Sequence, residues 1–221
     1  LVGSEMCIRD RLYAWIRSCV PDGATSADLS TFKSEKFRDE ISDYFDKAFL
    51  LTYYLWTDYF LAVDQRAKNM MLRTWDGLIW YITYYDGDTQ MGKRNDCFLV
   101  YDYTTDRDTY DAEAGKYAFE GRDSWLWNLV LANLDADLKT QAQALRGVLT
   151  TSRVLDMLNV EQAGNWCDRA YNKSGELKYI LPATQEMYGK VWPFIYALQG
   201  SNRAHREYFV RNRFALLDAK Y

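Results

Sequence analysis

Apolar and polar positions recur with a helical period across residues 34–63, with a break near Asp46. The second half of this segment is apolar nearly all round, which is typical of a helix buried at the centre of a domain. Its aromatic residues recur at alternating steps of four and three positions and therefore share one helix face: Phe49, Tyr53, Trp56 and Phe60. We interpret that aromatic face as core packing rather than as a ligand pocket.

The periodicity changes after this helix. Residues 70–74 and 78–85 form two short runs rich in β-forming residues, separated by Trp75, Asp76 and Gly77. An Asp-Gly pair between two such runs is a strong local signal for a β-hairpin. A polar, aspartate-rich loop follows, and residues 97–103 predict a further strand.

The remainder of the chain predicts helices. Asp123 or Ser124 can cap a helix that runs to residue 146, where Gly147 is placed to end it. Ser152 can cap the next helix, through about residue 171, before an Asn-Lys-Ser-Gly turn.

Two more helices complete the pattern. One is expected at residues 184–198, and the last begins at Ser201, with Phe209, Leu216 and Leu217 on its apolar face. The fold class predicted from these elements is α+β, a mostly helical domain with a small β-hairpin region.

Composition and charge narrow the range of partners. The chain of 221 residues carries a net charge of −4, so it lacks the basic field with which proteins collect nucleic-acid phosphates. The longest apolar run, residues 49–63, is too short to span a bilayer and contains Thr52, Thr57 and Asp58. We therefore expect neither a nucleic acid nor a membrane as a partner.

The cysteines and the single histidine argue against a zinc site. The four cysteines have no CxxC spacing and do not cluster with His205, which favours free thiols or core residues: Cys7, Cys19, Cys97 and Cys167. His205 stands among the arginines at positions 203, 206, 211 and 213, so we expect a solvated or partner-facing helix surface there.

The opening segment, residues 1–11, has a different character. Its string EMCIRDR looks like translated sequencing-adapter read-through of the kind found in metagenomic assemblies, so we exclude it from the fold. Residues 12–221 are then interpreted as one domain, a fragment of a larger protein.

Candidate chemistry is concentrated between residues 64 and 92. Asp64 and Asn69 are five positions apart, and Arg66 and Lys68 stand between them, where a basic side chain could meet a transferring phosphate. Because hairpin strands return the chain to its starting end, Asp86 and Asp88 should lie near Asn69. Carboxylate and amide oxygens are ligands that suit Mg²⁺.

The segment from Tyr44 to Gly92 resembles the CotH family of atypical, kinase-fold spore-coat proteins. The likeness is carried by YFDKAFLLTYYLWTDYFLAVD, QRAKNMMLR and WYITYYDGDTQMG. It implies a kinase-like C-lobe with Asp64 as the catalytic aspartate, Asn69 and Asp86 or Asp88 as metal ligands, and Mg²⁺ and ATP as cofactors. The sequence departs from typical protein kinases at Ala62 and Val63, where those carry His-Arg, and no glycine-rich phosphate loop is visible.

A second resemblance implies a different use of the same scaffold. The segments DQRAKNMM, YYDGDTQMG, SWLW, YNKSGELKY and LQGSNRAHREYFVRNRFALLDAKY are similar to large virion proteins of gut phages, of the tail knob or muzzle type. This likeness implies a tail-associated structural protein located in the virion, with other virion proteins or further copies of itself as partners. An active kinase would instead act on a protein substrate in the bacterial cytoplasm or the spore coat.

Other interpretations of the acidic residues stay open. Asp64 and Asn69 suit the cap and turn between a helix and a hairpin. The aspartates at positions 102, 106, 108 and 111 could form a calcium site, although the spacing lacks the glycine and the final glutamate of an EF-hand. Paired carboxylates could also serve a glycosidase, which the spacing of Asp64 and Asn69 does not support.

Overall fold

The computed structural model describes residues 2–87, 90–92, 102–105, 124–158, 169–171, 177–179 and 199–221. It confirms the predicted class at the level of a mixed α+β fold that is mostly helical and carries a small antiparallel sheet. None of the helices in these residues is long and apolar enough to cross a membrane.

The elements follow one another in two groups. The first contains α1 (Val2–Ser18), α2 (Ser26–Leu29), α3 (Glu35–Glu40), η1 (Ile41–Asp43), α4 (Lys47–Tyr59), η2 (Val63–Arg66), β1 (Met70–Thr74) and β2 (Trp80–Tyr84). The second contains α6 (Trp125–Asn133), α7 (Asp135–Val148), α8 (Thr151–Leu158), β3 (Arg169–Tyr171), β4 (Leu177–Tyr179) and α12 (Gln199–Lys220). Helix α1 runs without interruption across the predicted boundary at residue 11.

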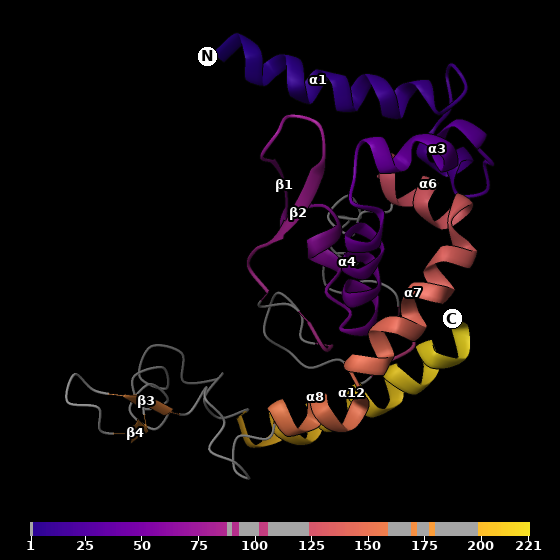
Figure 1. The fold of residues 1–221 in the computed structure, drawn as a ribbon. Helices are drawn as coiled ribbons and strands as arrows, with labels where there is room; N and C mark the ends of the chain where they lie inside the picture. Colours follow the sequence, from indigo (N-terminus) through magenta and orange to yellow (C-terminus); the bar gives the residue numbers. More distant parts are fainter. Residues whose placement is uncertain are drawn as a thin grey trace.

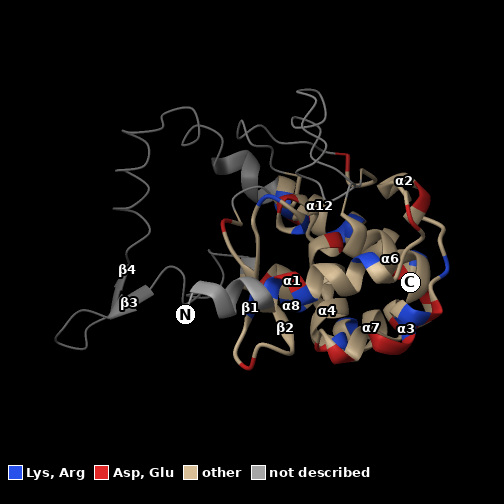
Figure 2. Ribbon diagram, turned by 90° about the horizontal axis from the view of Figure 1, so that it is seen from above, with Lys and Arg blue, Asp and Glu red and all other residues tan. Residues whose placement is uncertain are grey.

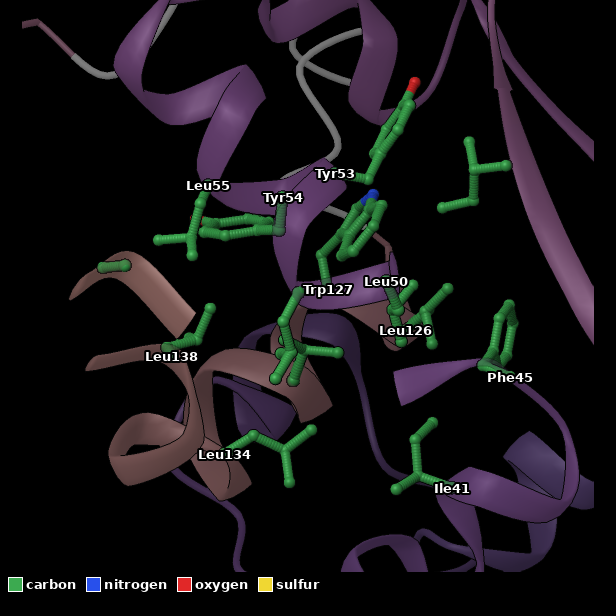
Figure 3. Close-up of a cluster of buried hydrophobic side chains, with 14 of the residues drawn as sticks. Ile41, Phe45, Leu50, Tyr53, Tyr54, Leu55, Leu126, Trp127, Leu134 and Leu138 are labelled. Carbon is green, nitrogen blue, oxygen red and sulfur yellow. The ribbon is translucent and has the colours of Figure 1, made fainter. Parts of the chain in front are cut away.

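Helix α4 is the central element, with the β1–β2 hairpin on one side and α7 on the other (Figure 1). The predicted break at Asp46 is confirmed, because its carboxylate caps α4 by accepting from the Phe49 backbone N–H at 3.0 Å. Most of α4 is buried, as its composition predicts. Figure 3 shows Leu50 and Leu55 of this helix among Trp127 and Leu138 from α6 and α7.

The aromatic face of α4 is only partly core. Tyr53 is 7% exposed, whereas Phe49 is 38% exposed and meets the ring of Tyr81 on the hairpin. Trp56 packs edge-on against Tyr84, with ring centroids 4.5 Å apart. The two described strands of the hairpin thus leave part of this face exposed.

The hairpin forms where the sequence predicts it. Strand β1 has the predicted bounds, and β2 is shorter at both ends, with Met70 opposite Tyr84 and Thr74 opposite Trp80. The loop between the strands is closed by Asp76, whose carboxylate accepts from the backbone N–H groups of Leu78 and Ile79. Gly77 supplies the positive φ of 75° that this turn requires.

Three helix predictions need correction. The helix expected to run to residue 146 is two helices separated at Leu134, and Gly147 lies inside α7 rather than beyond its end. The helix expected through residue 171 does not extend that far, since α8 is Thr151–Leu158 and Arg169–Tyr171 is a strand paired with β4. Ser124 caps α6 as predicted, but Thr150, rather than Ser152, receives the backbone N–H bond at the start of α8.

Some predictions fall outside the described residues. These are the helix at 184–198, the turn at 172–175, all of the strand at 97–103 except its last two positions, and Asp106, Asp108 and Asp111 of the candidate calcium loop. The carboxylate of Asp102 accepts from the backbone and side chain of Thr104 in a local turn.

Helix α12 begins at Gln199, before the predicted cap at Ser201. Its buried face includes Phe209 and Leu217 as predicted, but Leu216 is 37% exposed, and Val210 and Phe214 are buried instead. The helix packs against α8 and α4 (Figure 1). The last helix of the chain, α12, thus packs against the central helix α4, which lies far from it in the sequence.

Several charged residues on the described surface form ion pairs. Lys and Arg positions lie interspersed with Asp and Glu positions on the helices in Figure 2. On α7, for example, Asp135 pairs with Lys139 and Asp137 pairs with Lys47 of α4. Exposed pairs of this kind contribute little to stability.

Candidate functional site

The candidate site begins where α4 ends. Leu61 adopts a left-handed conformation with φ of 49°, and the Ala62 backbone N–H bonds back to the Thr57 carbonyl at 2.8 Å. This reversal directs the chain into the short helix η2, which carries Asp64, Gln65 and Arg66. The turn after η2 is closed by a bond of 2.8 Å from the Asn69 backbone N–H to the Asp64 carbonyl.

Two amide side chains bind the far end of the hairpin. The Gln65 amide donates to the backbone carbonyls of Tyr85 and Asp86, at 2.7 and 2.9 Å. The Asn69 amide donates to the same Asp86 carbonyl at 3.0 Å. The hairpin therefore returns Asp86 to Asn69, as its predicted topology requires. Asp88 lies outside the described residues.

Asp86 occupies an unusual backbone conformation. Its φ of 55° is in the left-handed region, where Asp and Asn are found more often than other non-glycine residues. Its carbonyl is the shared acceptor of the two amides, whereas the residue as a whole is exposed. The described bonds to Asp86 are therefore made by its backbone, while the residue is exposed.

Asp64 is completely buried, with 0% of its surface exposed. One of its carboxylate oxygens accepts from the Lys68 ammonium at 3.1 Å, and the Lys68 side chain is 38% exposed. The candidate base and one of the two candidate phosphate-binding cations are therefore paired with each other.

Arg66 lies in the core, although the sequence interpretation assigned it to a transferring phosphate. Its guanidinium donates to the Thr57 hydroxyl at 2.9 Å and to the Asp58 carboxylate at 3.2 Å. It also lies over the ring of Tyr54, 4.7 Å from the centroid. Arg66 is only 7% exposed, and these contacts connect η2 to α4.

Two aromatic side chains hold the backbone of η2 in position through hydrogen bonds. The Tyr53 hydroxyl donates to the Gln65 carbonyl at 2.9 Å, and the Trp127 indole N–H donates to the Arg66 carbonyl at 2.8 Å. The two rings stack nearly parallel, with centroids 6.2 Å apart (Figure 3). Elements far apart in the sequence, α4 and α6, thereby determine the position of the candidate site.

Asp58 is a buried ionic centre that the sequence interpretation missed. One of its oxygens accepts from the guanidinium groups of Arg66 and Arg213, at 3.2 and 2.9 Å. The other accepts from the Lys220 ammonium at 2.9 Å and the Tyr221 hydroxyl at 2.7 Å. Burial would raise the pKa of Asp58, but the charges of Arg66, Lys220 and Arg213 outweigh it and hold that pKa well below its usual range.

A signal for this centre is present in the sequence. Asp58 is the one acidic residue in an otherwise apolar helical run, and a charged residue in such a position is retained only when it is paired. The partners could not be identified, because Arg213 and Lys220 lie more than 150 positions further along the chain.

His205 is buried rather than solvated or partner-facing as expected. Its Nε2–H donates to the Met91 carbonyl at 2.8 Å, and the Met91 backbone N–H donates to the Phe60 carbonyl at 2.6 Å. His205 therefore links α12 to the turn that follows the hairpin. Burial, the largest effect, lowers the pKa of His205, while its bond to Met91 opposes that shift.

We expect stability to fall in acid in two stages. The unfolded chain binds a proton at His205 more readily than the folded protein does, so stability decreases as the pH falls below about 6.5. The lowered pKa of Asp58 changes stability in the same direction. The stability that Asp58 contributes is present above about pH 3.9 and is lost as the pH falls below that value. Urea unfolding at a series of pH values between about pH 7 and pH 3 measures both stages.

The variant His205→Gln should remove only the first stage of this profile. Equal stability of the wild type at about pH 7 and pH 5 would contradict the assignment of the first stage to His205.

The side chains around Asn69 include oxygen donors of the kind that Mg²⁺ prefers, and two of these side chains bond to other parts of the protein. Asp64 is paired with Lys68, and the Asn69 amide is bonded to the backbone of Asp86. Among the described residues, no three His, Cys, Asp or Glu side chains gather in a metal-binding arrangement. We therefore derive no catalytic step through Mg²⁺ at these residues.

Among the described side chains, Cys19 is a cysteine that lies in the core. It is a buried free thiol, as predicted, and burial raises its pKa to about 11. Such a thiol is a poor nucleophile, because the thiolate is the reactive form.

Comparison of the chain with known protein families, with curated proteins and with solved structures found no match.

Proposed function

We propose that this chain is a structural domain, built on a kinase-like scaffold, whose catalytic-loop segment serves the fold rather than phosphoryl transfer. The observation that carries the proposal is the burial of that segment. Asp64 and Gln65 are each 0% exposed, and Asn69 is 5% exposed. A catalytic aspartate has to come within hydrogen-bond reach of an acceptor hydroxyl, whereas the Asp64 carboxylate is buried in this structure and accepts from Lys68.

The partners we propose are other proteins of a phage virion, as the resemblance of the longer segments implies. The hairpin supports protein–protein contact, because it presents large apolar side chains to solvent. Met71, Trp75 and Leu78 are 46%, 81% and 52% exposed. Aromatic residues and methionine are enriched in protein interfaces, and clustered exposed apolar residues mark interaction sites.

The second candidate function is Mg²⁺- and ATP-dependent phosphoryl transfer of the CotH type. One observation favours it, namely the proximity of Asn69 and Asp86 after a hairpin of the predicted length. Asp64 would be the base, and Lys68 would be the remaining cation for a phosphate, since Arg66 is bonded to Asp58. Opening of the Asp64–Lys68 pair would be required before either side chain could act.

Thermal unfolding with and without Mg²⁺ and ATP separates the two candidates. We expect the melting temperature of the full chain to be unchanged, because a structural domain has no nucleotide site to saturate. A ligand at about a hundredfold its Kd would add about 2.7 kcal/mol, which corresponds to a rise of several degrees for a chain of this size.

The control variants are Asp64→Asn and Asp86→Asn, of which the second keeps a residue tolerated in the left-handed conformation. A rise in the wild type that both variants abolish, together with ATP turnover, would replace the structural proposal with the kinase.

A further inference from the structure

A pocket lies between three elements of the fold. Its volume is about 410 Å³, and its walls come from α1, β1 and the start of α6, together with Phe45 just before α4. In Figure 1, α1 crosses above the hairpin, and α6 lies beside α3 on the opposite side. A cavity of this size is within the range of small-molecule sites.

The walls of the pocket are apolar and adaptable. The aliphatic and aromatic side chains that line it are Leu12, Tyr13, Ile16, Phe45, Met70, Leu72, Trp125 and Leu126. The unbranched side chain of Met70 can adjust its shape to a flexible chain. The described lining contains no Asp, Glu, Asn or Gln, so it offers little to the hydroxyl groups of a sugar or the edges of a nucleobase.

Among the described residues that line this pocket, Arg17 is the one cation. Arg17 lines it and is exposed, and no carboxylate among the described residues pairs with it. The first turn of α6, at Ser124 to Leu126, also faces the pocket, and a helix N-terminus carries partial positive charge. Arg17 and the start of α6 therefore favour an anion, while the apolar lining favours hydrocarbon.

We propose that this pocket binds an amphipathic monocarboxylate, with an acyl chain of medium length among the apolar side chains and its carboxylate on Arg17. The guanidinium can bind a carboxylate through two parallel N–H bonds. Burial of the chain supplies the affinity, in proportion to the apolar area removed from water. A single cation matches a single negative charge better than it matches a phosphate or a nucleotide.

The test uses decanoate as the probe and the full chain as the protein. Titration calorimetry should show saturable binding of one decanoate per chain, below the concentration at which decanoate forms micelles. Arg17→Gln should weaken this binding about tenfold or more, because a charge-assisted bond is lost. Decanol, which has the same chain without the charge, should bind the wild type no better than decanoate binds Arg17→Gln.

Two further variants complete the design. Ile16→Trp places a large ring in the pocket and should abolish binding, with circular dichroism as the check that it folds. Arg38→Gln removes an exposed arginine of α3 that pairs with Glu35 and does not line the pocket, so it should leave binding unchanged.

Three results would overturn the proposal. One is the absence of saturable decanoate binding. Another is equal affinity of the wild type for decanoate and decanol. The third is equal affinity of the wild type and Arg17→Gln for decanoate. Either of these two results would mean that the carboxylate does not contribute to binding.

Discussion

The Asp58→Ala variant is expected to lose about 3–5 kcal/mol of unfolding free energy, because it leaves buried guanidinium groups without their carboxylate. Arg66 and Arg213 are 7% and 2% exposed, so neither can recover its lost interaction from water. Arg213 would keep its bonds to backbone carbonyls at Asp58, Tyr103 and Thr105, which accept hydrogen bonds but carry no full charge. The attachment of α12 to α4 should weaken most.

Urea unfolding at neutral pH measures this loss as a shift of the midpoint. Asp135→Ala is the matched control, because Asp135 forms an exposed pair with Lys139 and its loss should cost at most about 1 kcal/mol. Lys220→Met should also have a small effect, since that side chain is 51% exposed. A midpoint of Asp58→Ala equal to that of the control would contradict the prediction.

A triple variant shows whether the stability lost in Asp58→Ala comes from unpaired buried charges or from lost contacts. Combining Asp58→Leu with Arg66→Met and Arg213→Met removes the carboxylate and both buried cations together. Replacement of a whole buried ionic group by apolar residues is often neutral or stabilising. We therefore expect the triple variant to be more stable than Asp58→Ala, and this comparison remains informative if Asp58→Ala fails to fold.

The elements that the sequence predicted correctly are those whose signals are local. Asp46 caps α4 through a side chain three positions from its partner, and the Asp76–Gly77 pair closes the hairpin within its own loop. The proximity of Asn69 and Asp86 follows from the hairpin alone, because its register returns the chain to its starting end. These features need no knowledge of the rest of the chain.

The features that the sequence did not predict depend on distant partners. Arg66 looked like a surface cation between Asp64 and Asn69, but its partner is Asp58 and its environment is the core. His205 and Arg213 stand in a run of basic residues that reads as solvated, and both are buried because α12 packs against α4. The break at Leu134 likewise separates two helices that a continuous helical pattern had joined.

These differences change the meaning of the Asp64–Asn69 spacing. In the sequence, the spacing placed a base, two cations and a ligand in one short segment. In the structure, the side chains of Tyr53 and Trp127 donate hydrogen bonds to the backbone of that segment. Its own side chains Gln65 and Asn69 donate to the end of the hairpin. Residues that could perform chemistry are thereby engaged in joining α4, α6 and the hairpin.

Trp127→Ala should be the second severe substitution, with an expected loss of about 3–5 kcal/mol. Trp127 is 2% exposed, stacks on Tyr53 and lies against Tyr54 in the core. Its indole N–H is also the donor to the Arg66 carbonyl, so alanine leaves both a large cavity and a buried carbonyl without that bond.

Denaturant unfolding of Trp127→Ala and Trp127→Phe separates these two effects. Phenylalanine fills most of the cavity but cannot donate, so we expect its loss to be intermediate, and hydrogen exchange should increase at the amides around Arg66 in both variants. Trp75→Ala is the control, because Trp75 is 81% exposed and its removal should change stability by no more than about 0.5 kcal/mol. Equal stability of Trp127→Ala and Trp75→Ala would mean that Trp127 does not fix the position of η2, and the structural role proposed for the Asp64–Asn69 segment would lose its foundation.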